Sequence, residues 1–158
     1  MPARATATRL PAVLLVTLTG SCDSTPPESP PVALADLRSE VSGVVERYTA
    51  AVETRDSATL REVFVDDDRL VWLEQGEVRY RSVDDMLSSL ASFPPETSLV
   101  TRLEGLEVVP AGTSSAHAWA RFETTVGEGP ESFSFDGVLS LVLERTDRGW
   151  RVVGGHSS

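Results

Sequence analysis

Two stretches decide the fold: residues 41–64, VSGVVERYTAAVETRDSATLREVF, and residues 149–158, GWRVVGGHSS. The first continues an apolar pattern with steps of three and four residues, which places side chains on one helical face. That face consists of Leu34, Leu37, Val41, Val44, Tyr48 and Val52. Thr54-Arg55-Asp56 interrupts the pattern, and Asp56 or Ser57 can cap a second helix. The buried side of this second helix would be Leu60, Val63 and Phe64.

Beyond residue 66 the pattern becomes that of strands. Residues 70–73 and 78–80 flank Gln75-Gly76 and predict a hairpin. Ser82-Val83-Asp84-Asp85 is typical of a capping box, and Pro94-Pro95 would end the third helix that it opens. Four longer strands are predicted at residues 99–109, 115–126, 132–145 and 150–156. The resulting order, ααββαββββ, predicts one α+β domain whose long strands curl beneath three helices.

This order, closed by a strand that begins at Trp150, resembles the nuclear transport factor 2-like, or SnoaL-like, family over residues 34–158. The resemblance implies a cone-shaped α+β domain, with a curved antiparallel or mixed sheet wrapped around the three helices. It also implies an apolar pocket, open at one end, that receives small ligands. Relatives in this family bind, isomerise, cyclise, dehydrate or dimerise, so the fold leaves the reaction open.

The N-terminal residues are typical of an export signal. Arg4 and Arg9 precede a short apolar run, Leu10 to Leu18, that is too short to span a bilayer. Cys22, the only cysteine, follows small residues as in the lipobox of bacterial lipoproteins, although Thr19 stands where that motif usually has leucine. We therefore expect a signal peptide over 1–21, a lipidated Cys22 and a proline-rich tether over 22–33, which would anchor an exported protein in the cell envelope. The alternative is an ordinary signal peptide that leaves a free thiol.

Composition excludes several function classes. The formal net charge is −10 at pH 7, and all the basic side chains are arginines. An acidic surface disfavours nucleic acid and docking on anionic lipid, so the expected membrane contact is the lipid anchor alone. The absence of lysine excludes Schiff-base chemistry. Two histidines without a short paired spacing predict no metal site, and no cofactor motif is present.

Four residues are candidates for the pocket: Tyr48, Trp72, Glu74 and His156. The resemblance places Tyr48 where the ketosteroid-isomerase branch has its hydrogen-bond donor, although the helical pattern alone also accounts for a large side chain there. That branch needs a carboxylate base where this chain has Trp72, which cannot abstract a proton. Steroid isomerisation is thus disfavoured, and Trp72 is expected to be a pocket wall or core. Glu74 shares the parity of Trp72 and is the candidate base.

His156 shares the parity of Trp150, Val152 and Gly154, which predicts that it faces the interior. There it could act as general acid or base with Glu74 or Asp136. The alternative is a histidine that ends the strand through a hydrogen bond.

The strand over 115–126 alternates small and large residues. Ala116, Ala118 and Ala120 suit close packing beneath a helix, which leaves His117, Trp119 and Arg121 on the other face. The resemblance implies that this convex face forms a homodimer, and tryptophan with arginine suits an interface. A half-solvated face explains the pattern equally well.

The sequence therefore predicts an envelope-tethered, non-catalytic domain that binds a small apolar or aromatic molecule. The alternative is a small isomerase, lyase or cyclase, in which Glu74 and His156 exchange protons and Tyr48 donates a hydrogen bond.

Overall fold

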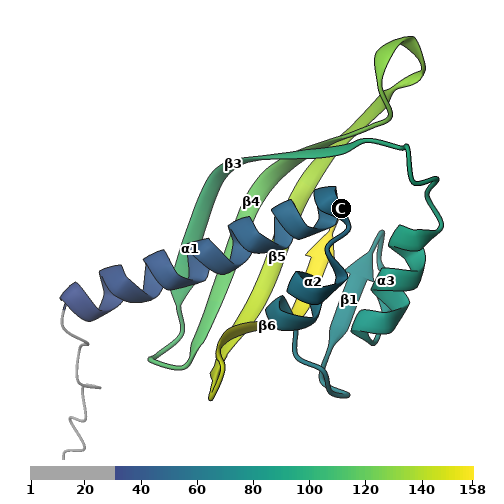
Figure 1. Cartoon of the computed structure of the whole chain (residues 1–158). Helices are drawn as coiled ribbons and strands as arrows, with labels where there is room; N and C mark the ends of the chain where they lie inside the picture. The colour runs from purple at the N-terminus through teal and green to yellow at the C-terminus, as the bar shows by residue number, and fades with distance from the viewer. Residues whose placement is uncertain (1–30) are drawn as a thin grey trace, which may run out of the picture.

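The computed structural model describes residues 31–158, in which helices cover one face of a curved sheet (Figure 1). Helix α1 (Pro31–Thr54) begins three residues before the predicted domain start at residue 34. Proline is accepted there because the first turn of a helix needs no intrahelical N–H donor. The predicted signal peptide, Cys22 and the tether up to residue 30 lie outside the described residues.

Two short helices follow the capping signals read from the sequence. The side chain of Asp56 accepts hydrogen bonds from the backbone N–H groups of Ala58 and Thr59, at 3.0 and 3.1 Å, and opens α2 (Ser57–Val63). The hydroxyl of Ser82 accepts one from the N–H of Asp85 at 3.1 Å and opens α3 (Val83–Ala91). Both predicted caps are confirmed.

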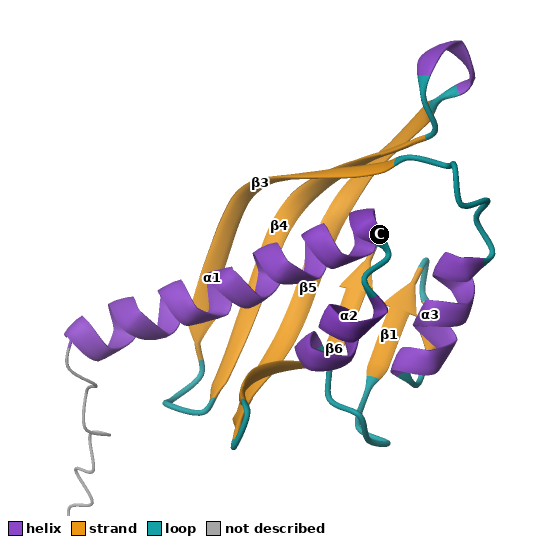
Figure 2. Cartoon of the chain, in the orientation of Figure 1, coloured by secondary structure: helices purple, strands orange, loops and turns teal. Residues whose placement is uncertain are grey.

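The sheet has the strand order β2-β1-β6-β5-β4-β3 (Figure 2). Its members are β1 (Val71–Glu74), β2 (Glu77–Tyr80), β3 (Leu99–Pro110), β4 (Ser115–Val126), β5 (Phe133–Thr146) and β6 (Gly149–Ser157). The β1–β6 pair is parallel and the other neighbouring pairs are antiparallel. The β4–β5 hairpin projects past the remaining strands and carries the 3₁₀ turn η1 (Gly129–Glu131) at its tip. The predicted α+β class and element order are confirmed.

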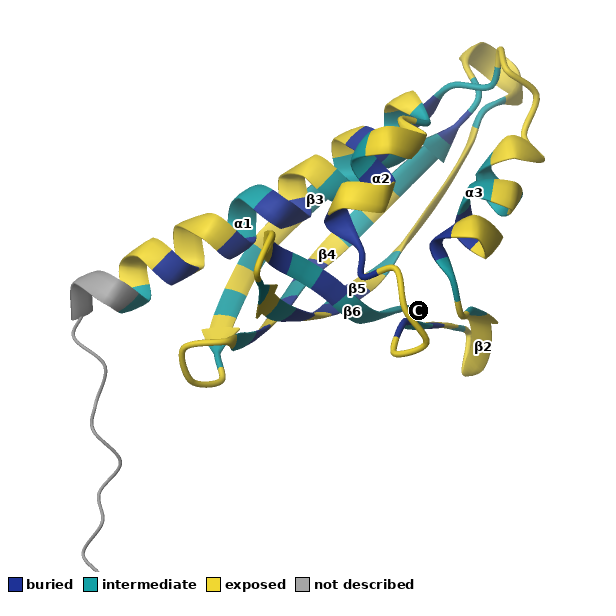
Figure 3. Ribbon diagram, turned by 60° about the horizontal axis from the view of Figure 1, so that its bottom comes forward, coloured by how far each residue is buried: buried dark blue, intermediate teal, exposed yellow. Residues whose placement is uncertain are grey.

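Helix α1 crosses the concave face of the sheet, and the buried residues lie between the two layers (Figure 3). Ala116, Ala118 and Ala120 of β4 are at most 2 % exposed. Their small side chains let the helix approach the sheet closely. His117 and Arg121, on the same strand, are exposed on the opposite face, which we call the outer face.

Within the described residues the sheet has three β-bulges; one lies in β3 between Glu104 and Glu107, and the other two change which residues face the cavity. In β2, Trp72 pairs with Tyr80 but Leu73 pairs with Val78, so Arg79 is an extra residue. In β6 the extra residue is Val153, because Leu143 pairs with Val152 whereas Val142 pairs with Gly154. A bulge breaks the alternation of side chains along a strand. Both shifts alter the composition of the site.

Candidate functional site

A cavity of about 280 Å³ lies between the C-terminal half of α1, helix α3 and the sheet. Its aliphatic lining includes Val52, Leu90, Leu99 and Leu139, and its aromatic lining comes from several strands and from α1. Small-molecule sites are concave and mostly apolar, with few polar groups, and this cavity fits that description at the small end of the usual range.

The deep aromatic wall of the cavity is formed by Tyr48 and Trp72. Tyr48 lies edge-on to Phe64, with ring centres 5.6 Å apart, and its ring centre is 5.7 Å from that of Trp72. Gly155 lies directly against the indole, since a Cβ atom there would be 2.3 Å from Cζ3 of Trp72. Trp72 can therefore occupy its position only because residue 155 is a glycine.

The Tyr48 hydroxyl is the polar group of this wall. Burial raises the pKa of Tyr48, because it removes the phenolate from water, and electrostatic interactions with the Tyr80 and Glu74 side chains raise it further. Within residues 31–158 no protein atom forms a hydrogen bond with this hydroxyl. Tyr48 is thus a neutral phenol that can donate a hydrogen bond to a bound molecule.

Glu74 and Arg79 form the rim of the cavity. The Arg79 Nε atom is 3.4 Å from Glu74 Oε2, and the two side chains are 56 % and 43 % exposed. The guanidinium carbon also lies 5.6 Å from the centre of the Tyr80 ring. Tyr80 in turn donates a hydrogen bond to Ser89 Oγ at 2.9 Å. The carboxylate of Glu74 therefore has a cation beside it.

Sequence analysis missed Arg79. Apolar Val78 and Tyr80 flank Arg79 in the sequence, but Val78 pairs with the outer-face residue Leu73, so Arg79 turns toward the cavity. The bulge keeps Tyr80, the next residue, on the same side, and both line the cavity. Nothing in the sequence of this short hairpin signals the bulge.

The prediction that His156 faces the interior is wrong. The extra residue Val153 separates it from Trp150 and Val152, so His156 pairs with Ser140 on the outer face. Gly155 and Ser157 take the inward positions, the former against Trp72 and the latter in the cavity lining. The space beside Gly155 is occupied by the Trp72 indole.

The acid–base set read from the sequence is therefore not assembled. Tyr48 and Glu74 line the cavity, whereas His156 lies on the other side of the sheet. Asp136 is exposed and pairs with Glu123, an outer-face residue of β4, so it does not replace the histidine.

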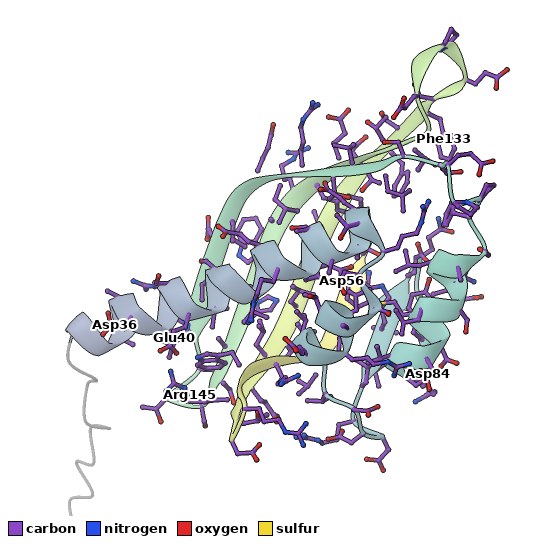
Figure 4. The ribbon with its side chains drawn as sticks, viewed as in Figure 1. Asp36, Glu40, Asp56, Asp84, Phe133 and Arg145 are labelled. Carbon is purple, nitrogen blue, oxygen red and sulfur yellow. The ribbon has the colours of Figure 1, made fainter. Side chains whose placement is uncertain are left out.

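Three phenylalanines mark the open end of the cavity. Phe93, Phe133 and Phe135 are 36 %, 59 % and 46 % exposed, although all three line it. The rings of Phe133 and Phe135 are stacked, with centres 6.5 Å apart. Figure 4 shows Phe133 at the base of the projecting hairpin. An apolar molecule that enters here meets aromatic side chains first.

The two other depressions lie along the N-terminal half of α1 and are open and polar. Glu40 lies between Arg145 and Trp150 there, and its Oε2 atom accepts a hydrogen bond from Trp150 Nε1 at 2.8 Å. Figure 4 shows Glu40 and Arg145 side by side. These side chains already satisfy one another, so the apolar cavity is the better ligand site.

The outer face carries the residues predicted for a dimer. His117, Trp119 and Arg121 lie there, and His117 Nε2 is 3.0 Å from Ser140 Oγ. Ser140 is also the cross-strand partner of His156, so it lies between the two histidines. The same face exposes several apolar side chains: Leu73, Val100, Val109, Val138 and Val142.

Residues 31–158 contain no group of three or more His, Cys, Asp or Glu side chains arranged to hold a metal ion. In the same part of the chain, no helix has the length and apolarity needed to cross a bilayer.

A profile of the SnoaL-like domain matches residues 41–158. The chain belongs to the SnoaL-like domain family. A search of curated proteins found no relative of significant sequence similarity.

Solved structures support the same fold. A nuclear transport factor 2-like superfamily protein from Salmonella enterica has a TM-score of 0.69 at 16 % identity, over 79 % of this chain and 92 % of its own. A nuclear transport factor 2-like protein of unknown function in nutrient uptake, from Rhodospirillum rubrum, has a TM-score of 0.63 at 24 % identity, over 75 % and 96 %. The hexachlorocyclohexane dehydrochlorinase LinA-type3 from Novosphingobium barchaimii has a TM-score of 0.68 at 15 % identity, over 80 % and 88 %. Proteins of this fold therefore include an enzyme as well as proteins without an assigned reaction.

Proposed function

We propose that this SnoaL-like domain binds a small, largely apolar molecule in the cavity and does not transform it. The observation that carries this proposal is the cavity itself, whose lining is mainly aliphatic and aromatic, with hydroxyl groups from Tyr48 and from several serines and threonines and with the half-exposed charges of Glu74 and Arg79. Burial of a ring-containing molecule there would contribute about 25 cal/mol for each Å² of apolar surface removed from water.

Tyr48 would orient the ligand. Its neutral hydroxyl donates to an acceptor such as a carbonyl or ether oxygen, and the low polarity around it strengthens that bond. A ligand without an acceptor near Tyr48 would forgo this hydrogen bond and bind through its apolar contacts alone. The cavity therefore favours an apolar ring or short chain that carries one acceptor.

Proton-transfer chemistry finds less support. General acid–base catalysis needs two groups within reach of the reacting atoms, and His156 lies on the outer face. The remaining alternative is an isomerase, lyase or cyclase in which Glu74 acts as base and Tyr48 as donor. It is favoured by the electrostatic coupling between these two side chains, but Arg79 already contacts the Glu74 carboxylate at 3.4 Å and would compete with a substrate for it.

Adjacent residues on β6 offer a matched test. Ser157→Phe would fill the cavity, whereas His156→Phe places the same side chain on the outer face. In a thermal-shift screen against apolar and aromatic carbonyl compounds, we expect ligands to raise the melting temperature of wild type and His156→Phe but not of Ser157→Phe. Equal shifts for both variants would contradict binding in this cavity.

We further propose that Cys22 is lipidated and that residues 22–33 tether the domain to the cell envelope. The sequence supports this through the signal-like segment before the single cysteine. In a bacterium that processes lipoproteins, the wild type is expected in the detergent phase and Cys22→Ala in the aqueous phase. The same distribution for both proteins would refute lipidation.

For the outer face we propose a second copy of the chain as partner. Two neighbouring cross-strand pairs of β3 and β4 carry opposite charges in opposite order: Arg102 with Glu123, and Glu104 with Arg121. Each charge therefore has opposite charges as its neighbours along the strand and across the pair. A two-fold axis along the strands would place each charge opposite its complement in the other copy. Sedimentation velocity should show a dimer that Trp119→Glu dissociates. An Arg148→Glu control, in the β5–β6 turn, should remain dimeric, and a wild-type monomer at high concentration would refute the proposal.

A further inference from the structure

The rim of the cavity carries a feature that points to the class of ligand. Among the described residues that line the cavity, Arg79 is the single positively charged side chain. The chain as a whole has a formal net charge of −10. An arginine directed into an apolar cavity of an acidic protein therefore needs an explanation beyond solubility.

The β1–β2 hairpin turns this arginine toward the cavity. Val78 pairs with the outer-face residue Leu73, so Arg79 follows on the inner face, and the bulge keeps Tyr80, opposite Trp72, on that face as well. Bulges often re-aim a side chain next to a functional site. The guanidinium then stacks over the Tyr80 ring, and Tyr80 is held by its hydrogen bond to Ser89. Stacking reduces the freedom that Arg79 would lose on binding a ligand.

The donor groups of Arg79 are only partly used. The Tyr80 side chain interacts with the guanidinium and, with Glu74 at 3.4 Å from Nε, raises the pKa of Arg79, which leaves part of its five-donor guanidinium for a further acceptor. Two parallel N–H groups match the geometry of a carboxylate, which accepts both. The ion pair between Glu74 and Arg79 is partly exposed and therefore weak, so a ligand carboxylate could replace Glu74 at little cost in free energy.

A cationic ligand fits less well. An ammonium group would have to share Glu74 with Arg79 and would meet the guanidinium at close range. A carboxylate meets the remaining donors instead. Its body would extend past Tyr80 toward the apolar interior that begins at Leu90.

We propose that the ligand is an amphipathic carboxylic acid, with an apolar ring or short chain in the cavity and its carboxylate on the Nη atoms of Arg79. This proposal rests on the proposed function and specifies the ligand class for the same cavity. Arg79 would then determine specificity, while the apolar walls supply most of the affinity.

Three probes of matched shape test this proposal by calorimetry on the full chain at pH 7: 2-naphthylacetic acid, 2-(2-naphthyl)ethanol and 2-(2-naphthyl)ethylamine. We expect the acid to bind about five- to tenfold more tightly than the alcohol, as for a partly exposed charge-assisted pair, and the amine to bind most weakly. Arg79→Gln should remove the preference for the acid and leave the affinity for the alcohol unchanged. Arg81→Gln, an exposed neighbour, should keep the preference.

The outcomes separate the two proposals. Tightest binding of the alcohol or the amine would overturn the carboxylate assignment and leave the cavity as a binding site. A preference for the acid that survives Arg79→Gln would also overturn it. If no probe binds and the broader screen finds no ligand, the proposed function fails together with the carboxylate assignment. Glu74→Gln provides an independent check, because removal of the competing carboxylate should strengthen binding of the acid about twofold or more.

Discussion

Replacement of Gly155 by alanine should disturb the aromatic wall of the cavity. The new Cβ atom would lie 2.3, 2.5 and 3.0 Å from Cζ3, Cε3 and Cη2 of Trp72. Ordinary carbon–carbon contacts are about 3.5–4.0 Å, so the indole must move by roughly 1 Å or more. Trp72 is only 4 % exposed and packs against Phe64 and Tyr48, which leaves the cavity as its direction of escape.

The expected penalty is that of overpacking a core, about 1–3 kcal/mol in the free energy of unfolding. For a domain of this size that corresponds to a melting temperature lower by about 4 °C for each kcal/mol. The displaced indole would also occupy ligand space, so the affinity of any ligand found by the screen should fall. Urea titration followed by tryptophan fluorescence, together with calorimetry on the same variant, measures both effects.

Gly43→Ala is the matched control. No atom lies within 4 Å of a Cβ built at this residue, which is in the middle of α1. Alanine is the better helix former, so this variant should be more stable by about 0.5–1 kcal/mol. If Gly155→Ala showed the same gain and bound ligand normally, the close packing of Trp72 against β6 would be refuted.

Three further predictions concern single side chains. Tyr48→Phe should weaken binding of carbonyl ligands by about three- to tenfold in calorimetry and change stability little, because the hydroxyl has no hydrogen-bond partner in the described residues; a large fall in melting temperature would contradict this. Arg55 donates to the carbonyl oxygens of Pro94, Pro95 and Thr97 at 3.3, 2.9 and 2.6 Å, so Arg55→Asn should destabilise the domain by about 2 kcal/mol and speed hydrogen exchange in residues 92–98, and unchanged exchange would count against this contact. The hydroxyl and then the backbone N–H of Thr59 lower the pKa of Asp56 below 3.8, so its contribution to stability is present above that pH and is lost as the pH falls below it. Asp56→Ala should therefore be destabilised at pH 7 and converge on the wild type in acid titrations, and a constant difference at all pH values would contradict the assignment.

The helices and most of the strands could be predicted because each is determined by local chemistry. Asp56 and Ser82 cap their helices through bonds to residues two or three positions away. The alternation of alanine with large residues in β4 likewise shows which face meets a helix. Such signals are contained within a few neighbouring residues.

The site was harder to predict, because two bulges reverse the facing of the residues that follow them. Parity counted from Trp150 fails at Val153, and parity counted from Val78 fails at Tyr80, which lies on the same side of the sheet as Arg79. A bulge forms where packing against other elements favours it, here around Val152 and Trp72, and those contacts span much of the chain. Tyr48, Trp72 and Glu74 lie in elements that contain no extra residue, so their predicted facing holds, and all three line the cavity.

The length of α1 sets the direction in which the cavity can exchange its ligand. About 25 Å of helix, at 1.5 Å per residue, separates Pro31 from Tyr48. The open end of the cavity, marked by Phe133, lies farther still from the start of α1 (Figure 4). In a chain anchored through the residues before Pro31, the helix would act as a spacer that holds the opening away from the anchoring bilayer. Such a domain would sample solutes of the surrounding compartment, and the lipids of its own membrane would stay out of its reach.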